Sequence, residues 1–104
     1  MRFPFSDLAA TKLRPALVVA AHGEDFIVMG IFSRVSGRTV RRTWVQIDEH
    51  QAGFRRTGLK KTSLLKAEKI AVVRRSVLQR ELGAMGADLL AQMQAALKRA
   101  LLLS

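Results

Sequence analysis

The sequence has 104 residues, 49% of them hydrophobic and 25% charged, which predicts one globular domain over residues 1–104 rather than a disordered chain. The absence of cysteine excludes disulfides, thiolate metal sites and a cysteine nucleophile. Eighteen Lys and Arg against eight Asp and Glu give a net charge of +10, which favours a nucleic acid, an acidic protein or an anionic membrane surface as partner. There is no signal-peptide pattern and no apolar run near the ~18 residues of a membrane span, so we expect a cytoplasmic protein without a membrane partner.

The first clear β pattern begins beside an arginine. Residues 1–12 are a short apolar start followed by a polar loop from Ser6 to Lys12. Pro15 holds its own φ near −65° and pushes Arg14 into an extended conformation. Residues 15–20 are apolar and predict a buried strand. A guanidinium at the start of a rigid strand suits a phosphate or a carboxylate, and the alternative is a surface arginine before an ordinary strand.

The later segments predict a small barrel of five to seven short strands followed by one helix. Gly23 lies in a polar turn between the strand 15–20 and an apolar run at 26–32, which together indicate an antiparallel hairpin. The other assignments are a loop at 34–39, a half-buried strand at 43–47, a long exposed loop at 48–58, short strands at 63–66 and 70–73 around a polar step at 67–69, a strand at 77–82, and an amphipathic helix at about 87–102. The predicted fold class is therefore mainly β with a C-terminal helix.

Basic residues concentrate in the middle of the chain. Only Asp48 and Glu49 oppose them there. Such a run favours a surface for nucleic acid, and the alternative is a merely solvated face. The residues concerned are Arg34, Arg38, Arg41, Arg42, Arg55, Arg56, Lys60 and Lys61.

Most standard catalytic motifs are missing from the sequence. His22 and His50 lie in separate loops and are more often bystanders than an acid–base pair. No spacing indicates a metal site, a phosphate-binding glycine loop or a serine nucleophile. RNA, however, carries its own nucleophile in the 2′-OH, so its cleavage needs only a base, an acid and cations around the phosphate, without a metal or another cofactor. The side chains of Arg14, Ser33, Lys66 and Glu68 could supply such a site if the strand ends converge.

Several segments of the sequence together form a pattern that extends over nearly the whole chain. They are Phe3-Pro4-Phe5-Ser6-Asp7-Leu8, Lys12-Leu13-Arg14-Pro15-Ala16-Leu17-Val18-Val19, Asp25-Phe26-Ile27-Val28-Met29-Gly30-Ile31-Phe32-Ser33-Arg34, Gly58-Leu59-Lys60-Lys61-Thr62-Ser63, Lys66-Ala67-Glu68-Lys69-Ile70 and Leu82-Gly83, followed by the final helix. In the order and spacing of these segments the sequence resembles the MazF/PemK-like toxins, although no single motif would suffice.

The resemblance implies an SH3-like, CcdB/PemK-like barrel, usually a homodimer, that acts as a type II toxin. Such a toxin cuts single-stranded mRNA at short sequences without a metal, inhibits growth and is held inactive by an antitoxin, through which operator DNA is a further partner. The implied roles are phosphate contact and proton transfer for Arg14, substrate positioning for Ser33 and Lys66, and proton acceptance for Glu68. We expect the RNA backbone to lie on basic residues, namely Lys12, Arg34, Arg38, Arg41, Lys60 and Lys61. The +10 charge predicts an acidic antitoxin.

The sequence departs from the family pattern at three places. A further strand usually precedes the Phe3-Pro4-Phe5 segment, which indicates either a start that was assigned late or a barrel that is incomplete at the N-terminus or completed by a partner. Phe32 stands where the family usually has threonine, although Ser33 keeps a hydroxyl next to it. Lys66 replaces the usual arginine and loses its bidentate phosphate geometry.

Two other functions remain open at this point. A catalytically impaired member of the family would still bind antitoxin or nucleic acid without cutting RNA. A gyrase poison is also compatible with the same fold, but the matching motifs are those of the ribonuclease branch.

Overall fold

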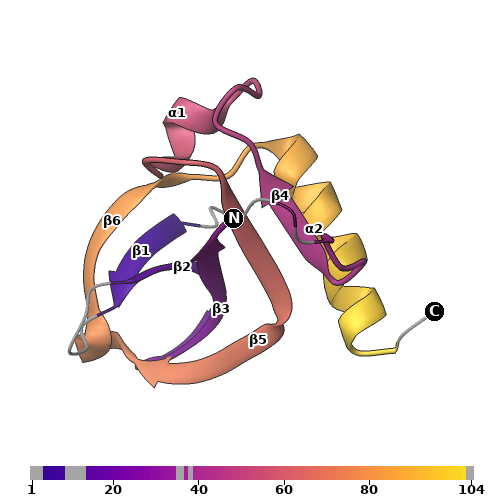
Figure 1. Ribbon diagram of the computed structural model, residues 1–104. Helices are drawn as coiled ribbons and strands as arrows, with labels where there is room; N and C mark the ends of the chain where they lie inside the picture. Colours follow the sequence, from indigo (N-terminus) through magenta and orange to yellow (C-terminus); the bar gives the residue numbers. More distant parts are fainter. Residues whose placement is uncertain (1–3, 9–13, 35–36, 38, 103–104) are drawn as a thin grey trace.

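In the part of the chain that the structure describes, six antiparallel strands form one sheet in the order β4-β5-β3-β2-β1-β6. This computed structural model describes residues 4–8, 14–34, 37 and 39–102. Figure 1 shows the sheet rolled upon itself, with α2 beside β4. The elements are β1 (Pro4–Leu8), β2 (Arg14–His22), β3 (Asp25–Ser33), β4 (Trp44–Ile47), α1 (Phe54–Thr57), β5 (Ser63–Arg74), a 3₁₀ turn (Arg75–Val77), β6 (Leu78–Ala84) and α2 (Ala87–Ala100). The predicted architecture, mainly β with a C-terminal helix, is confirmed.

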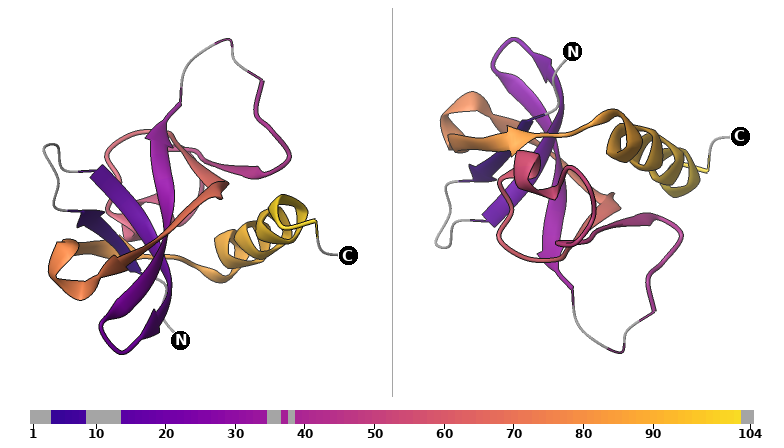
Figure 2. Two further views of the ribbon diagram at one scale, coloured as in Figure 1. Left: turned by 90° about the horizontal axis from the view of Figure 1, so that it is seen from below. Right: turned by 90° about the horizontal axis from the view of Figure 1, so that it is seen from above.

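The larger core lies between the sheet and α2. Alternate residues of the strands, such as Met29 and Ile31 of β3, point to this core, because successive side chains of a strand face opposite sides. From α2 the residues Leu89, Met93 and Ala96 fill it at helical spacing. Figure 2 shows from two directions that α2 lies to one side of the rolled strands.

A smaller core occupies the opposite face of the sheet. Its buried members are Ala16, Val18 and Val28, from the paired strands β2 and β3. Since both faces of these two strands are covered, their sequences are nearly continuous runs of apolar residues.

The hairpin between β2 and β3 follows the sequence prediction. Gly23 has a φ of 63° in the turn, a conformation that glycine adopts without the steric cost of a Cβ atom. The strands pair from Ala16↔Gly30 to His22↔Asp25, with one irregularity between Val18 and Ala20. The hairpin fixes which residues of β3 lie opposite the start of β2.

The structure differs from the sequence assignments at three places. Residues 6–8 belong to β1 and pair with both β2 and β6, although their polar composition predicted a loop. The segment 48–58 contains the four-residue helix α1, which is too short to show a periodic pattern. The strands predicted at 63–66 and 70–73 are one strand, β5, with an irregularity opposite Met29 and Gly30.

That irregularity in β5 matters for the site described below. Met29 pairs with Ile70, whereas the next residue, Gly30, pairs with Lys66. Residues 67–69 are therefore extra on β5, and such a bulge bends the strand and redirects its side chains. The bulged segment is also tied to the start of β4, since the backbone N–H of Ala67 donates to the carbonyl of Thr43 at 3.0 Å.

Candidate functional site

Lys66 lies between two aromatic rings. Its Nζ is 4.5 Å from the centre of the Phe32 ring and 4.3 Å from the centre of the Trp44 ring. Trp44 pairs with Lys66 across β4 and β5, and Phe32 comes two residues after Gly30, the partner of Lys66 on β3. Both contacts fall within the range of cation–π attraction. Three neighbouring strands thus build one cluster of a cation and two aromatic rings.

Gly30 makes room for this cluster. A Cβ atom at position 30 would lie 2.8 Å from Cε2 of Phe32 and 3.4 Å from Cβ of Lys69. A side chain here would push the Phe32 ring away from Lys66. The absence of a side chain at position 30 therefore leaves space for the Phe32 ring.

Glu68 is held in place by hydrogen bonds at both of its carboxylate oxygens. Trp44 Nε1 donates to Oε2 at 2.7 Å, and Thr43 Oγ1 donates to Oε1 at 2.8 Å. A guanidinium nitrogen of Arg41 lies 3.7 Å from Oε2. Partial burial acts to raise the pKa of Glu68, but the hydrogen bonds from Trp44 and Thr43, a backbone N–H and the Arg41 charge outweigh it and lower the pKa. Glu68 is therefore ionised at neutral pH.

Two arginines border the same cluster. The carbon at the centre of the Arg41 guanidinium lies 5.3 Å from the centre of the Trp44 ring. Arg34 Nε donates to Gln46 Oε1 at 3.1 Å, and Gln46 comes two residues after Trp44 on the same strand. Of the residues predicted as RNA contacts, Arg41 thus lies at the Trp44 ring, and Arg34 is bonded to a neighbouring residue of β4.

Arg14 begins β2, and its backbone pairs with Leu8 of β1. It lies two residues before Ala16, the partner of Gly30, while Phe32 lies two residues after Gly30. The start of β2 and the end of β3 therefore meet at one edge of the fold. The Arg14 side chain, Lys12 and Arg38 lie outside the described part of the structure.

Ser33 is exposed at the last position of β3, where it pairs with Ser63. Because side chains alternate along a strand, it lies on the opposite face from Phe32, the neighbour that contacts Lys66. The structure therefore brings Lys66 and Glu68 to one cluster, with Ser33 at the adjacent strand end but on the other side of the sheet.

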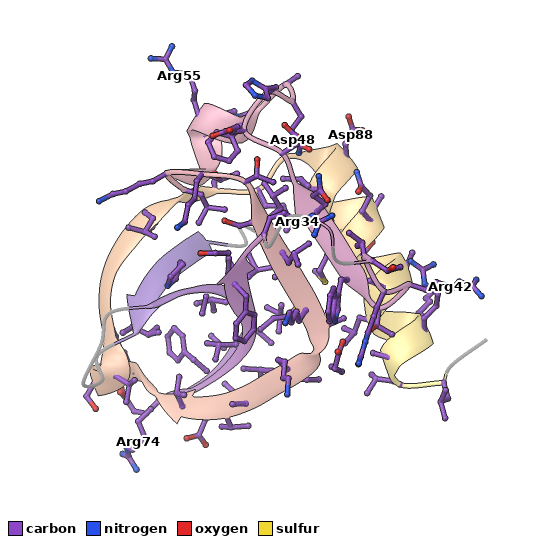
Figure 3. All side chains as sticks on the ribbon, viewed as in Figure 1. Arg34, Arg42, Asp48, Arg55, Arg74 and Asp88 are labelled. Atoms are coloured by element: carbon purple, nitrogen blue, oxygen red, sulfur yellow. The ribbon has the colours of Figure 1, made fainter. Side chains whose placement is uncertain are left out.

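The remaining basic residues of the middle segment are spread over the surface. Lys60 and Lys61 are exposed in the connection between α1 and β5. Arg55 points outward from α1, while Arg42 lies beside the C-terminal part of α2 (Figure 3). The carbonyl of Arg42 accepts a hydrogen bond from Arg99 Nε at 2.7 Å. Only part of the positive charge therefore gathers at the aromatic cluster.

Neither a metal group nor a membrane span is found in the part of the chain that the structure describes. Among these residues no three His, Asp or Glu side chains come together as a possible set of metal ligands. Neither α1 nor α2 has the length and apolar character that crossing a bilayer requires.

Sequence reasoning did not identify Trp44 or Thr43 as site residues. One signal was present: Trp44 follows the alternation that puts Val45 and Ile47 in the core, so it lies on the other face of β4. A large aromatic residue on the polar face of an edge strand is unusual unless it has a partner. That partner, Glu68, is 24 residues away in the sequence and could not be found from local pattern.

Comparison with known proteins shows a match over almost the whole chain. Residues 3–101 match the family model described as "PemK-like, MazF-like toxin of type II toxin-antitoxin system". No curated protein sequence matches significantly.

Several solved structures resemble this one over most of their length. The toxin MazF-mt6 of Mycobacterium tuberculosis superposes with a TM-score of 0.78 at 22% identity, covering 97% of this chain and 98% of that one. An endoribonuclease from a Mycobacterial species, in complex with its cognate antitoxin, gives 0.79 at 20% identity over 100% and 96%. MazE-MazF of Deinococcus radiodurans gives 0.70 at 21% identity over 97% and 93%. At these identities the likeness establishes the fold.

Proposed function

The chain belongs to the PemK-like, MazF-like toxins of type II toxin-antitoxin systems, and from this we propose that it is an endoribonuclease. It cuts single-stranded mRNA in the cytoplasm at short sequences and so inhibits growth. The observation that carries the proposal is the family match over residues 3–101, which includes the Arg14-Pro15 start of β2. Two of the structural neighbours are themselves named endoribonucleases.

The reaction we propose uses the 2′-OH of the substrate as nucleophile. A base removes its proton, the 2′-oxygen bonds to phosphorus, and the bond to the 5′-oxygen breaks as that oxygen takes a proton. The products are a 2′,3′-cyclic phosphate and a 5′-OH. Cations near the phosphate stabilise the charge that develops, and no metal is required.

In this proposal Arg14 contacts the phosphate and transfers a proton to the leaving oxygen, as the family resemblance implies. Lys66 and Ser33 position the substrate. Glu68 is the proposed proton acceptor, and its lowered pKa supports the ionised form that this role needs. The same lowered pKa makes Glu68 a weak base, so we expect a modest contribution from it.

The test is cleavage of a single-stranded RNA of varied sequence by the purified chain in the presence of EDTA. We expect fragments with 5′-OH ends at a short recurring sequence, and none when the nucleotide before the cut carries a 2′-deoxyribose. Arg14→Ala should slow cleavage by about 100-fold or more, the typical loss when one charge-stabilising group is removed. Arg74→Ala, which Figure 3 places at the opposite end of the molecule from α1, is the matched control. Equal rates for wild type and Arg14→Ala would refute the assignment.

A second candidate function is binding of antitoxin or RNA without cleavage. Two observations favour it: Phe32 replaces the usual threonine, and both oxygens of Glu68 already accept hydrogen bonds. In the same assay this candidate predicts retention of intact RNA at every pH and no difference between wild type and Glu68→Gln.

We further propose that the chain forms a homodimer and binds an acidic antitoxin, through which it reaches operator DNA. The net charge of +10 supports an acidic partner. Light scattering after gel filtration tests the dimer. For the antitoxin, the test is co-purification of the chain with a small acidic protein encoded by a neighbouring gene. The amount that co-purifies should fall as the salt concentration is raised.

A further inference from the structure

Trp44 is the only tryptophan of the chain, and the protein fixes its orientation. Its one polar atom, Nε1, donates to Glu68 at 2.7 Å. Glu68 is itself fixed by Thr43 Oγ1 at 2.8 Å. A side chain whose hydrogen bond is already satisfied offers a ligand only its ring face. Trp44 is half-buried, so part of this flat surface faces solvent.

The charges around Trp44 differ in how firmly they are held. Lys66 Nζ lies between the two rings at 4.3 and 4.5 Å and is half-buried. Arg41 is more distant from the ring centre, at 5.3 Å, and its side chain is 70% exposed. Arg41 also gives up its 3.7 Å contact with Glu68 when it leaves, but such exposed ion pairs contribute little, so Arg41 leaves the ring at lower cost than Lys66.

An aromatic face bordered by one exposed and one half-buried cation suits single-stranded nucleic acid. Bases stack on the ring whatever their sequence, and the cations take the phosphates. An acidic peptide would be bound by the cations alone and would have no use for a preoriented indole. A base-paired duplex keeps its bases stacked on one another and cannot offer a free face.

We propose that Trp44 is a stacking platform for one unpaired base of the RNA, and that Glu68 is the positioning residue that orients it. On binding, the base replaces the Arg41 guanidinium over the indole, and Arg41 moves to a neighbouring phosphate. Lys66 and Phe32 support the platform from the side of β5 and β3. This deepens the proposed function, on which it rests, by assigning a base-binding subsite.

The single tryptophan allows a direct measurement. Wild-type protein is titrated with a single-stranded RNA that carries 2′-O-methyl groups throughout and so cannot be cut. We expect quenching of Trp44 fluorescence with a midpoint that tracks the binding curve of the same RNA measured by anisotropy of a labelled strand. The duplex form of this RNA should quench far less. Arg74→Ala should keep the full quenching amplitude.

Variants at position 44 separate stacking from charge. With labelled 2′-O-methyl RNA, Trp44→Leu should raise Kd roughly 5- to 150-fold, the range for loss of one base–aromatic stack. Trp44→Phe keeps a ring and should lose much less affinity. Circular dichroism and thermal unfolding serve to check that both variants fold. Glu68→Ala should lower the steady-state anisotropy of Trp44 emission and weaken binding less than Trp44→Leu does, because it frees the ring without removing it.

The outcomes distinguish this inference from the proposed function. If Trp44→Leu cuts RNA normally and binds it with unchanged affinity, and RNA does not quench the fluorescence of the wild type, the stacking site is overturned and the ribonuclease remains. Quenching and a Trp44-dependent Kd in a protein that cuts no RNA uphold the site and refute the ribonuclease. Quenching by an acidic peptide, with none by RNA, overturns the stacking site in favour of a partner interface.

Discussion

At the scale of the single residue, Glu68 shows how a surface carboxylate is turned into a fixed part of a site. Its side chain is 30% exposed, yet an indole N–H, a hydroxyl and a guanidinium converge on it from residues 41–44. The cost of ordering the side chain is offset because each of these contacts favours the charged form. The same contacts fix the Trp44 ring, so one residue links the charge of the site to its aromatic surface.

The lowered pKa of Glu68 predicts an acid-dependent part of the stability. Because the folded pKa lies below its ordinary value near 4.5, the ionised group stabilises the fold above that pH, and this contribution is lost as the pH falls through the folded pKa. In urea unfolding, the free energy of unfolding should drop more steeply below about pH 4.5 in wild type than in Glu68→Gln. Identical pH profiles for the two proteins would contradict the assigned contacts.

Thr57 gives a second prediction at this scale. It is fully buried at the end of α1, where its Oγ1 donates to the Phe54 carbonyl at 2.6 Å and accepts from the Leu59 N–H at 3.1 Å. Thr57→Val keeps the shape but removes both bonds, and we expect a loss of about 1–3 kcal/mol in the free energy of unfolding. Thr39→Val, at an exposed position before β4, is the control and should change it by less than about 0.5 kcal/mol.

At the scale of the element, the contact of α1 with β6 depends on two glycines. A Cβ atom on Gly83 would lie 2.1 Å from the carbonyl oxygen of Arg56, and one on Gly58 would lie 2.1 Å from that of Leu82. The two backbones therefore touch directly, with no side chain between them. These glycines lie in the Gly58-Leu59 and Leu82-Gly83 segments that contribute to the family resemblance.

Replacement of Gly83 by alanine should separate α1 from β6. Since the obstructing atoms are backbone, which cannot rotate away, we expect a loss of about 3 kcal/mol, the upper part of the usual range for overpacking. Gly86→Ala is the matched control: no atom lies within 4 Å of its Cβ position, so the change should stay within about 1 kcal/mol. Thermal unfolding of the two variants measures the difference. Equal midpoints would show that the α1–β6 contact tolerates a side chain.

The elements that rest on local pattern were predictable from the sequence. The hairpin of β2 and β3 and the helix α2 follow from apolar periodicity and from the turn at Gly23. The pairing of β1 with β6 was not predictable, because it joins residues as distant in the sequence as Pro4 and Ala84. In the sequence, the bulge at 67–69 appears only as a polar step, which predicted two strands where the structure has one.

The candidate site was predictable to the same limited extent. Lys66 and Glu68 were proposed together, and the structure brings both to Trp44, but through a bulge rather than a regular strand. Thr43 and Trp44 were missed because their contacts depend on the register of β4 against β5, which no local pattern fixes. The roles assigned to Arg14, Ser33, Lys66 and Glu68 all stay predictions.

At the scale of the whole molecule, the charge of +10 predicts salt-sensitive RNA binding. For single strands, log K falls with log salt by about 0.7 per phosphate contact. The double variant Lys60→Ala/Lys61→Ala should therefore reduce the slope by about 1.4 if both residues contact phosphates. Arg74→Ala should leave it unchanged. Binding isotherms at several salt concentrations, again with 2′-O-methyl RNA, supply the slopes, and a slope that the double variant does not alter would exclude these lysines from the RNA path.

The pairing of β1 with β6 has a consequence for the synthesis of the toxin. The strand formed by residues 4–8 can pair at its second edge only after residues 78–84 have been synthesised. The larger core is complete only after Leu89, Met93 and Ala96 of α2 have been synthesised. Contacts between such distant residues slow folding, since a long loop has to close before they stabilise anything. A ribosome-bound chain that lacks α2 therefore has no complete core. Under the proposed function, each molecule could act on RNA only after its last helix has been made, which would leave an interval for binding by an antitoxin already present.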